Sequence, residues 1–424
     1  MDVNGKEHAY SYAIVEDIHN YAKKIAWTKR RLATLPQGDI GIRFIDKLKL
    51  VGLSDARLCY YGDRVPRLLD EFEKIGVKLK SSKKKDCEAV LSVILSQKYK
   101  GETKCAFAVT LLRLVHFAKK DEIGDKKRGY VKEVAWISPT QYKDKNQGIQ
   151  PKDLLTIEEL KAIINQTTNK RDRAMLWVMF EGAFRPGELL HLRVGGIDFR
   201  DDYVLVSTHG KTGSKSVALV ISFKPLLEWL DEHPLRDDPN APLWYSFWKS
   251  SRTKQVTYGY LREHLKRCKE KAGIKKRVWN YLFRHSQLTN LAKKLSDQTL
   301  RVYGNWGAGS KMPAKYAHLS GKDAENAILE LHGIRSADNN NSAFPRLKKC
   351  PRCGSDNTPE KHRCTSCGYI IDERLLAETL KTQQSTIEGI VKRLENVEKL
   401  GEKIDLLFDE LINQKSTCQK TEIS

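Results

Sequence analysis

The sequence predicts a mainly helical protein with a small antiparallel sheet, divided into several domains. Apolar residues recur at three- and four-residue steps over much of the 424-residue chain, which is the helical period. One segment near the middle instead has the pattern of two strands around a glycine-rich turn. Near the end, four closely spaced cysteines precede a long stretch without proline. These observations predict helical domains, one small sheet, a cysteine module and a long terminal helix.

The charge of the chain predicts a polyanionic partner. Lys and Arg number 75 against 53 Asp and Glu, which gives a net charge of +22. Nucleic acid is the first candidate, with an anionic membrane surface or an acidic protein as alternatives. The first 370 residues hold this excess, because residues 371–415 contain ten acidic and seven basic residues. The chain has no apolar leader and no transmembrane-length apolar run, so we expect a soluble cytoplasmic protein associated with the nucleoid.

The first third of the chain has a basic, helical pattern. Residues 1–44 form a mixed segment whose most regular part is a basic helix. Residues 45–136 carry helical periodicity, with glycine turns and basic clusters between the helices, which predicts a small all-helical domain. The polar stretch 137–152 holds two prolines and lacks periodicity, so it is predicted to be a linker.

Residues 153–334 are predicted to form a mixed α/β domain. Thr156 stands three residues before Glu159, a capping-box arrangement that begins a helix. A more buried helix follows at 171–184, and the strand pair with its turn lies at 202–222. Further helical patterns occur near residues 225–232, 260–272, 284–294 and 297–303.

Several basic and aromatic residues of this domain stand in unusual settings. Arg185 ends a strongly apolar helix, directly before Pro-Gly. Arg284 lies near a helix start, where a guanidinium and free backbone N–H groups bind phosphate well. Considered singly, each is typical of an ordinary ion pair or of a side chain that reaches solvent. A series in chain order indicates a shared site: Arg185, Lys211, Tyr281, Arg284, Trp306 and Tyr316.

This series resembles the active site of the tyrosine recombinase, or phage integrase, family. Three local matches carry the resemblance: AFRPGELLHLRVGGIDF, the hairpin GKTGSKSVAL, and YLFRHS followed by YGNWGAGSKMPAKYAHLSG. They cover residues 154–333, and the preceding helical segment looks like the family's core-binding DNA-binding domain. The resemblance implies a site-specific DNA recombinase, an integrase of a mobile element. It also implies double-stranded DNA as partner and a homo-oligomer that is a tetramer on DNA.

The resemblance assigns chemical roles to these residues. Tyr316 would attack a phosphodiester, which leaves a 3′-phosphotyrosine and a free 5′-hydroxyl. Arg185 and Arg284 would bind the non-bridging oxygens and stabilise the charge that grows in the transition state. Lys211 would protonate the departing oxygen as a general acid.

Two further residues have supporting roles in the same scheme. Trp306 would position the phosphate, and Glu188 would orient the arginine or lysine groups. Catalysis would need no metal, because the arginines supply the electrostatic stabilisation.

One position departs from the family pattern. Tyr281 stands where the family usually has histidine. In this departure the chain resembles some archaeal and archaeal-virus integrases. A phenol can hydrogen-bond a phosphate oxygen but cannot act as an imidazole acid or base near neutral pH. His285 and His318 are expected to be structural. Tyr316 is therefore expected to ionise with help from the arginines and the phosphate rather than from a histidine.

Alternatives remain open for residues and for function. Lys215 is the rival of Lys211, and Tyr281 and Tyr303 are rival nucleophiles; Tyr316 is preferred for its spacing after the second arginine. A protein of the same fold that binds DNA without cutting is the second functional hypothesis. A type IB topoisomerase-like activity is the third.

The cysteine module, residues 350–370, follows a polar linker at 335–349. Its two CxxC motifs are ten residues apart, and each is followed by glycine, which lets the backbone curl around the sulfurs. Four thiolates suit tetrahedral Zn²⁺, so we expect a compact zinc ribbon with structural zinc; a disulfide or redox pair is the alternative. His362 is an alternative ligand. The expected ligands are Cys350, Cys353, Cys364 and Cys367.

Residues 371–415 repeat apolar positions at alternating three- and four-residue steps. This heptad pattern has two flaws, Gln383 and Gly401, and predicts a coiled coil that joins protomers. The alternative is one amphipathic helix packed on its own body.

Overall fold

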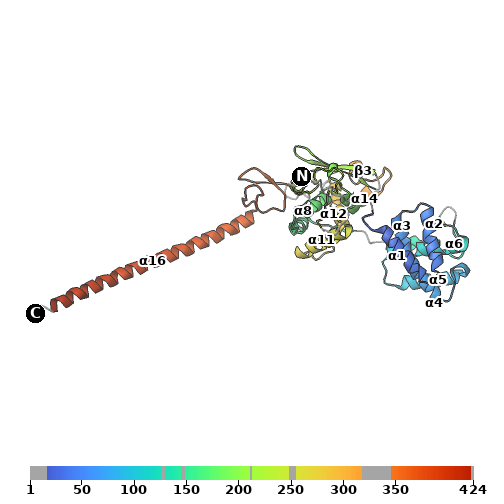
Figure 1. Cartoon of the computed structure of the whole chain (residues 1–424), viewed down its shortest axis with the longest axis horizontal. Helices are drawn as coiled ribbons and strands as arrows, with labels where there is room; N and C mark the ends of the chain where they lie inside the picture. The colour runs from blue at the N-terminus through green and yellow to red at the C-terminus, as the bar shows by residue number, and fades with distance from the viewer. Residues whose placement is uncertain are drawn as a thin grey trace, which may run out of the picture.

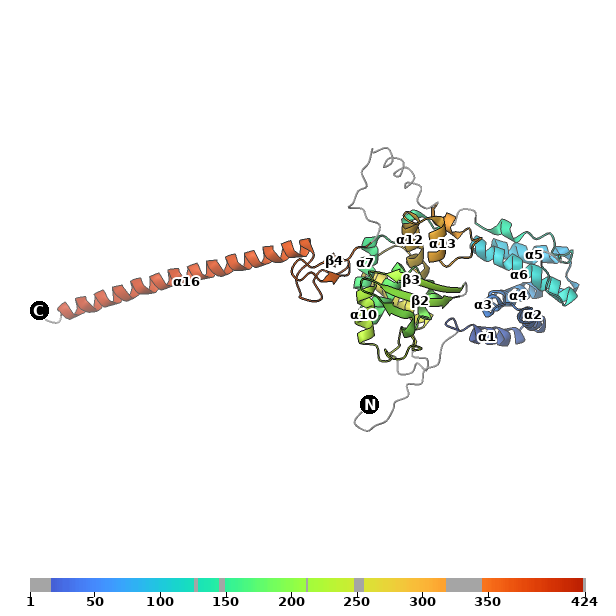
Figure 2. The same cartoon turned by 90° about the horizontal axis from the view of Figure 1, so that it is seen from above.

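The computed structural model describes three connected parts: a helical unit, a central unit, and a cysteine module that carries a long helix (Figure 1). The described residues are 17–125, 129–144, 149–210, 213–247, 255–317 and 345–421. The predicted fold class, mainly helical with small antiparallel sheets, is confirmed. Figure 2 shows the helical unit and the long helix on opposite sides of the central unit.

The helical unit is built around α6, whose apolar face contacts α2, α4 and α5. Phe44 of α2 packs against Tyr61 and Phe117 in this core. Burial of large side chains of this kind stabilises the fold by roughly 1.5–3 kcal/mol each. The helices are α1 (Tyr21–Ala33), α2 (Gly38–Leu50), α3 (Asp55–Gly62), α4 (Val65–Lys74), α5 (Lys84–Ser96) and α6 (Gly101–Lys120).

The central unit begins at the predicted capping box. The Thr156 side chain accepts a hydrogen bond from the Glu159 amide, and the Glu159 carboxylate accepts one from the Thr156 amide. The helices are α7 (Ile157–Asn165), α8 (Lys170–Glu181), α9 (Pro186–Leu190), α10 (Phe223–Asp231), α11 (Tyr258–Lys271), α12 (Asn280–Ala292), α13 (Asp297–Tyr303) and α14 (Met312–Ala317).

The sheet of the central unit has three antiparallel strands in the order β1 (Ile197–Phe199), β2 (Val204–Gly210) and β3 (Gly213–Leu219). Gly210 pairs with Gly213 across the turn, so the predicted strand pair is confirmed. The first strand is only three residues long, too short for a period-two pattern to be recognised.

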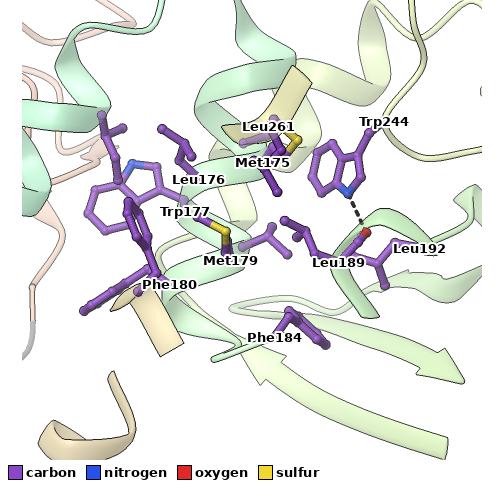
Figure 3. Packing of buried hydrophobic residues seen from close by; sticks show 14 of the residues in the cluster. Met175, Leu176, Trp177, Met179, Phe180, Phe184, Leu189, Leu192, Trp244 and Leu261 are labelled. Carbon is purple, nitrogen blue, oxygen red and sulfur yellow. Dashed lines mark hydrogen bonds between the residues drawn. The ribbon is translucent and has the colours of Figure 1, made fainter. Parts of the chain in front are cut away.

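Helix α8 is buried on nearly all sides, which agrees with the unbroken apolar run at residues 174–180. Figure 3 shows Met175, Trp177 and Phe180 of α8 packed within this core, with Trp244 on another side. The Trp244 indole N–H donates to the Leu189 carbonyl at 2.8 Å, which satisfies its polar atom inside the core. Helix α8 is thus a rigid base for the loop that follows it.

A buried carboxylate fixes the end of α8. The Glu181 side chain accepts hydrogen bonds from the backbone amides of Val220, Ile221 and Ser222 at 2.7–3.0 Å. Burial raises the pKa of Glu181, and these hydrogen bonds oppose that shift. The contact joins α8 to the segment after β3, and so it positions the β2–β3 hairpin beside the α8–α9 loop.

The cysteine module contains the short strand pair β4 (Lys348–Lys349) and β5 (Asp356–Asn357) and leads into α16 (Glu373–Thr421). Helix α16 extends away from the central unit in both views (Figures 1 and 2). Within the described residues, no helix combines the length and apolar character needed to cross a membrane.

Candidate active site and cysteine cluster

Two arginines, one at the start of α9 and one on α12, share the carboxylate of Glu188 on α9. The Glu188 carboxylate pairs with the Arg185 guanidinium and lies 3.8 Å from the Arg284 guanidinium. Glu188 is 5% exposed and Arg284 3%, so these charges lie in a low-dielectric setting. Two cations and one anion leave one net positive charge, which suits the single negative charge of a phosphodiester.

The backbone holds both guanidiniums in place. Arg284 donates to the carbonyls of Ala183 and Gly304, and Arg185 donates to the Asn305 carbonyl at 3.3 Å. Ala183 has φ +45°, a left-handed conformation that lets the chain turn sharply after α8. Burial, then the neighbouring Arg185, lowers the pKa of Arg284 to about 10, and the group stays protonated at neutral pH.

Tyr316 lies inside this site, on the short helix α14. Its side chain is 3% exposed, and its ring stacks on Trp306 with centroids 5.5 Å apart. The Arg284 guanidinium also packs against Trp306, 5.3 Å from the centroid of its ring. Burial raises the pKa of Tyr316, whereas Arg284 and Arg185 oppose that shift. The Tyr316 side chain therefore lies close enough to both arginines to feel their charge.

One residue of α12, His285, contacts Tyr316, which the sequence did not predict. His285 was expected to be structural, yet its Nδ1 lies 3.0 Å from the Tyr316 hydroxyl. Tyr281, one turn earlier, is 41% exposed, with its ring centroid 6.3 Å from that of His285. His318 lies outside the described residues.

Of the two candidate lysines, the structure describes only Lys215. Lys211 lies outside the described residues. Lys215 on β3 is 4% exposed, and its ammonium donates to the Gly182 carbonyl at 2.6 Å. Burial, then Arg284, lowers the pKa of Lys215 to about 7. The period-two pattern of β3 could have indicated this inward direction, because Val217 is on the same face and is buried.

The rival nucleophile Tyr303 is engaged elsewhere. Its hydroxyl donates to the Glu181 carbonyl, and burial raises its pKa. The Lys215 ammonium lies 5.2 Å from its ring centroid, so Tyr303 forms one wall around that lysine.

The four cysteine sulfurs converge on one point, all within 4.8 Å of one another. Two of the sulfur pairs are 3.6 Å apart, close to the separation of about 3.8 Å expected for tetrahedral Zn²⁺ with bonds of about 2.3 Å. Gly354 and Gly368 have φ of +71° and +74°, the left-handed turns predicted after each CxxC. The donor set and its geometry fit a zinc ion held by Cys350, Cys353, Cys364 and Cys367.

The cysteine module is attached on both sides. His362 is not among the converging ligands; its Nδ1 lies 2.8 Å from the Asp372 carboxylate, directly before α16. Lys224 of α10 donates to the Asp356 carbonyl at 3.1 Å and to the Thr365 hydroxyl. The module thus connects the central unit to the long helix.

Comparison with known proteins places this architecture. Residues 153–322 match the model of the phage integrase family. Tyrosine recombinase slr0733 of Synechocystis sp. (strain ATCC 27184 / PCC 6803 / Kazusa) is 22% identical over 243 residues, which cover 55% of this chain and 70% of that protein.

Two solved structures share the fold. The XerH site-specific recombinase bound to palindromic difH substrate, a post-cleavage complex, aligns with a TM-score of 0.52 and 18% identity over 76% of this chain and 99% of that chain. The Tn1549 transposon integrase in complex with transposon right end DNA aligns with a TM-score of 0.50 and 14% identity over 69% and 99%.

The tyrosine packed among two arginines lies within residues 153–322, the part of the chain that matches the phage integrase family. This part of the chain is similar in sequence to a tyrosine recombinase and shares its fold with solved recombinases and integrases.

Proposed function

We propose that this recombinase cuts and rejoins DNA at specific sites through a 3′-phosphotyrosine formed on Tyr316. The supporting observation is the position of the Tyr316 hydroxyl: it hydrogen-bonds His285 beside two arginines of the same chain. A scissile phosphate at the guanidiniums would face this hydroxyl. The arrangement supports attack by each protomer's own tyrosine.

The arginines stabilise the transition state in this scheme. Attack on a phosphodiester adds negative charge to the non-bridging oxygens, and Arg185 and Arg284 already carry their charge in fixed positions. Preorganised donors of this kind are commonly worth about 3 kcal/mol each. Trp306 orients the attacking ring by stacking, and Glu188 holds the two guanidiniums relative to each other.

We propose that a lysine of the β2–β3 hairpin protonates the departing 5′-oxygen. Lys211, at the turn, fits the family pattern, whereas the described geometry supports Lys215, which is buried beside both arginines. A pKa of about 7 would let Lys215 release a proton near neutral pH.

Substitution of each lysine by alanine distinguishes the two. Loss of the general acid should slow cleavage about 10²–10⁴-fold, because the alkoxide leaves unprotonated. A substrate with sulfur in place of the bridging 5′-oxygen should restore the rate, since a thiolate leaves readily without a proton. We expect rescue of Lys215→Ala. Rescue of Lys211→Ala alone would assign the role to Lys211 instead.

Covalent trapping tests the proposed function. A suicide DNA substrate, whose cleaved end diffuses away, should leave the protein attached to the 3′ side of the cut. Sequencing of the captured DNA would give the target site. Binding of a cognate site without any adduct would favour the non-cleaving alternative, and relaxation of supercoiled plasmid without site preference would favour the topoisomerase alternative.

The net charge of +22 supports double-stranded DNA as the ligand, with the helical unit as core-binding domain. Tyr281 in the usual histidine position supports an archaeal-type integrase of a mobile element, acting on DNA in the cytoplasm.

We propose that the cysteine cluster binds one structural Zn²⁺. Metal analysis of the purified chain should give about one zinc per chain. Cys350→Ser together with Cys353→Ser should remove the metal and loosen the attachment of α16, since metal binding drives folding of such small modules. Cys268→Ser is the matched control, because that buried cysteine lies on α11, outside the cluster. Protein without zinc that keeps a protease-resistant module would contradict the proposal.

We also propose that α16 assembles protomers through a four-stranded coiled coil. Its apolar seam is exposed along the part of the helix where side chains are described, and no apolar partner covers it there. In heptad terms, β-branched residues occupy three consecutive d positions, which disfavours two strands and favours three or four. Gln383 at d and Gly401 at a interrupt the seam. Val391 and Leu400 flank the seam and widen it. The seam comprises Leu380, Ile387 and Leu394 at a, and Ile390, Val397 and Ile404 at d.

Removal of residues 371–424 should lower the oligomeric mass in light scattering. The expected change is from tetramer to monomer or to weakly associated species without DNA. Ile390→Asn with Val397→Asn should act like the truncation, because polar groups at d positions oppose burial of the seam. Lys392→Asn, on the outer face of the helix, is the control. An unchanged mass after truncation would contradict this proposal.

A further inference from the structure

An imidazole contacts the nucleophilic oxygen of the proposed reaction. His285 follows Arg284 on α12, and its Nδ1 is 3.0 Å from the Tyr316 hydroxyl of α14. The two rings are tilted by 30° with centroids 5.9 Å apart, so the contact is edge-on at the polar atoms rather than a stack. This hydrogen bond directly joins the two elements that carry an arginine and the tyrosine of the site.

The charge state of His285 suits a proton acceptor. Burial, then the positive charge of Arg284, lowers the pKa of the imidazole to about 4, so the resting group is neutral. With its proton on Nε2, the ring presents a lone pair at Nδ1 to the phenolic hydrogen. An anionic phosphate bound at the arginines would raise the basicity of this imidazole as the reaction begins.

The other groups around Tyr316 are less suited to take its proton. Arg284 remains protonated, and its guanidinium already donates to two backbone carbonyls. Glu188 is occupied by the Arg185 guanidinium and backbone amide. Lys215 donates to the Gly182 carbonyl. Among the described side chains, His285 is the neutral base within hydrogen-bond distance of the hydroxyl.

We infer that His285 accepts the phenolic proton of Tyr316 during strand cleavage and returns it during rejoining, an inference that rests on the proposed function. As the Tyr316 oxygen bonds to phosphorus, its O–H bond breaks and the proton moves to Nδ1, which gives an imidazolium. The bond from phosphorus to the 5′-oxygen breaks, and that oxygen takes a proton from the hairpin lysine. In rejoining, each proton moves back, so no external reactant is needed.

In this scheme a histidine deprotonates Tyr316 even though Tyr281 occupies the position where the family usually has histidine. The usual histidine position is solvent-facing here, and its tyrosine cannot accept a proton at neutral pH. The imidazole instead lies four residues later on the same helix, one turn along, and contacts the tyrosine rather than solvent.

Single-turnover cleavage of a suicide DNA substrate tests the inference with His285→Asn and His285→Ala. Asparagine can accept a hydrogen bond at about the position of Nδ1 but cannot take the proton. Both variants should therefore cleave about 10²–10⁴-fold more slowly than the wild type. The 5′-sulfur substrate should not restore either variant, because the defect concerns the attacking oxygen, not the leaving one. Added imidazole should partly restore His285→Ala.

The outcomes separate the inference from the proposed function. Cleavage by His285→Asn within about threefold of the wild type would mean that the hydrogen bond only positions the tyrosine, which would overturn the inference alone. Rescue of His285→Asn by the sulfur substrate would also overturn it. Absence of any adduct with wild-type protein on a cognate site that it binds would overturn the proposed function itself. DNA affinity and thermal unfolding of each variant identify failure to fold, and imidazole rescue reports only on folded protein.

Discussion

Tyr316→Phe should abolish the covalent protein–DNA adduct and leave DNA binding intact. Phenylalanine preserves the ring that stacks on Trp306 and removes only the hydroxyl that contacts His285. Without the oxygen no phosphotyrosine can form, so the expected loss is to the detection limit rather than a fractional decrease. Adduct formation is measured by gel shift under denaturing conditions with the suicide substrate, and binding by a native gel shift.

Tyr303→Phe is the matched control for this experiment. It removes one hydroxyl from a tyrosine of the same unit, but that hydroxyl donates to the Glu181 carbonyl. We expect Tyr303→Phe to keep forming the adduct. An adduct that persists in Tyr316→Phe and disappears in Tyr303→Phe would move the nucleophile to Tyr303.

Arg284→Ala should have the second largest effect on cleavage. The substitution removes a buried, fixed cation that faces the developing phosphate charge, so single-turnover cleavage at saturating DNA should fall about 10²–10³-fold. Arg284→Lys should also be strongly impaired, because an ammonium cannot reproduce the planar, bidentate fork. The free energy of unfolding should also fall, by about 1–3 kcal/mol, since the Ala183 and Gly304 carbonyls lose their donor.

Two comparisons control for this loss of stability. Arg200→Ala removes an exposed arginine that pairs with Asp198 and should leave the cleavage step unchanged. Measurement at a temperature well below the unfolding midpoint of Arg284→Ala separates the chemical defect from loss of folded protein. A folded Arg284→Ala protein that cleaves within about tenfold of the wild type would contradict the assigned role.

The local features of the fold could be predicted because their signals are local. The capping box at Thr156, the β2–β3 hairpin and the cysteine turns each depend on residues a few positions apart. Helix α8 could likewise be predicted as buried, since residues 174–180 form an unbroken apolar run of nearly two turns. The order of Arg185, Arg284 and Tyr316 along the chain predicted that they share one site. The structure brings their side chains together.

The parts that were missed depend on packing between distant segments. The contact of His285 with Tyr316 spans 31 residues, and the helical period of α12 alone cannot show that α14 packs against that face. A histidine that contacts the proposed nucleophile is therefore indistinguishable, in sequence, from a structural one. The burial of Lys215 could have been predicted from the sequence, because strand alternation directs this side chain toward the buried side of β3.

Mass spectrometry of the trapped complex tests most directly whether Tyr316 forms the covalent link. Trypsin places the three candidate tyrosines in different peptides: residues 278–284 hold Tyr281, 302–311 hold Tyr303 and 316–322 hold Tyr316. After nuclease digestion of the suicide complex, we predict a nucleotide attached through phosphate to the peptide 316–322, or to its extended form when cleavage after Lys315 is blocked. A nucleotide on either of the other two peptides would contradict the account.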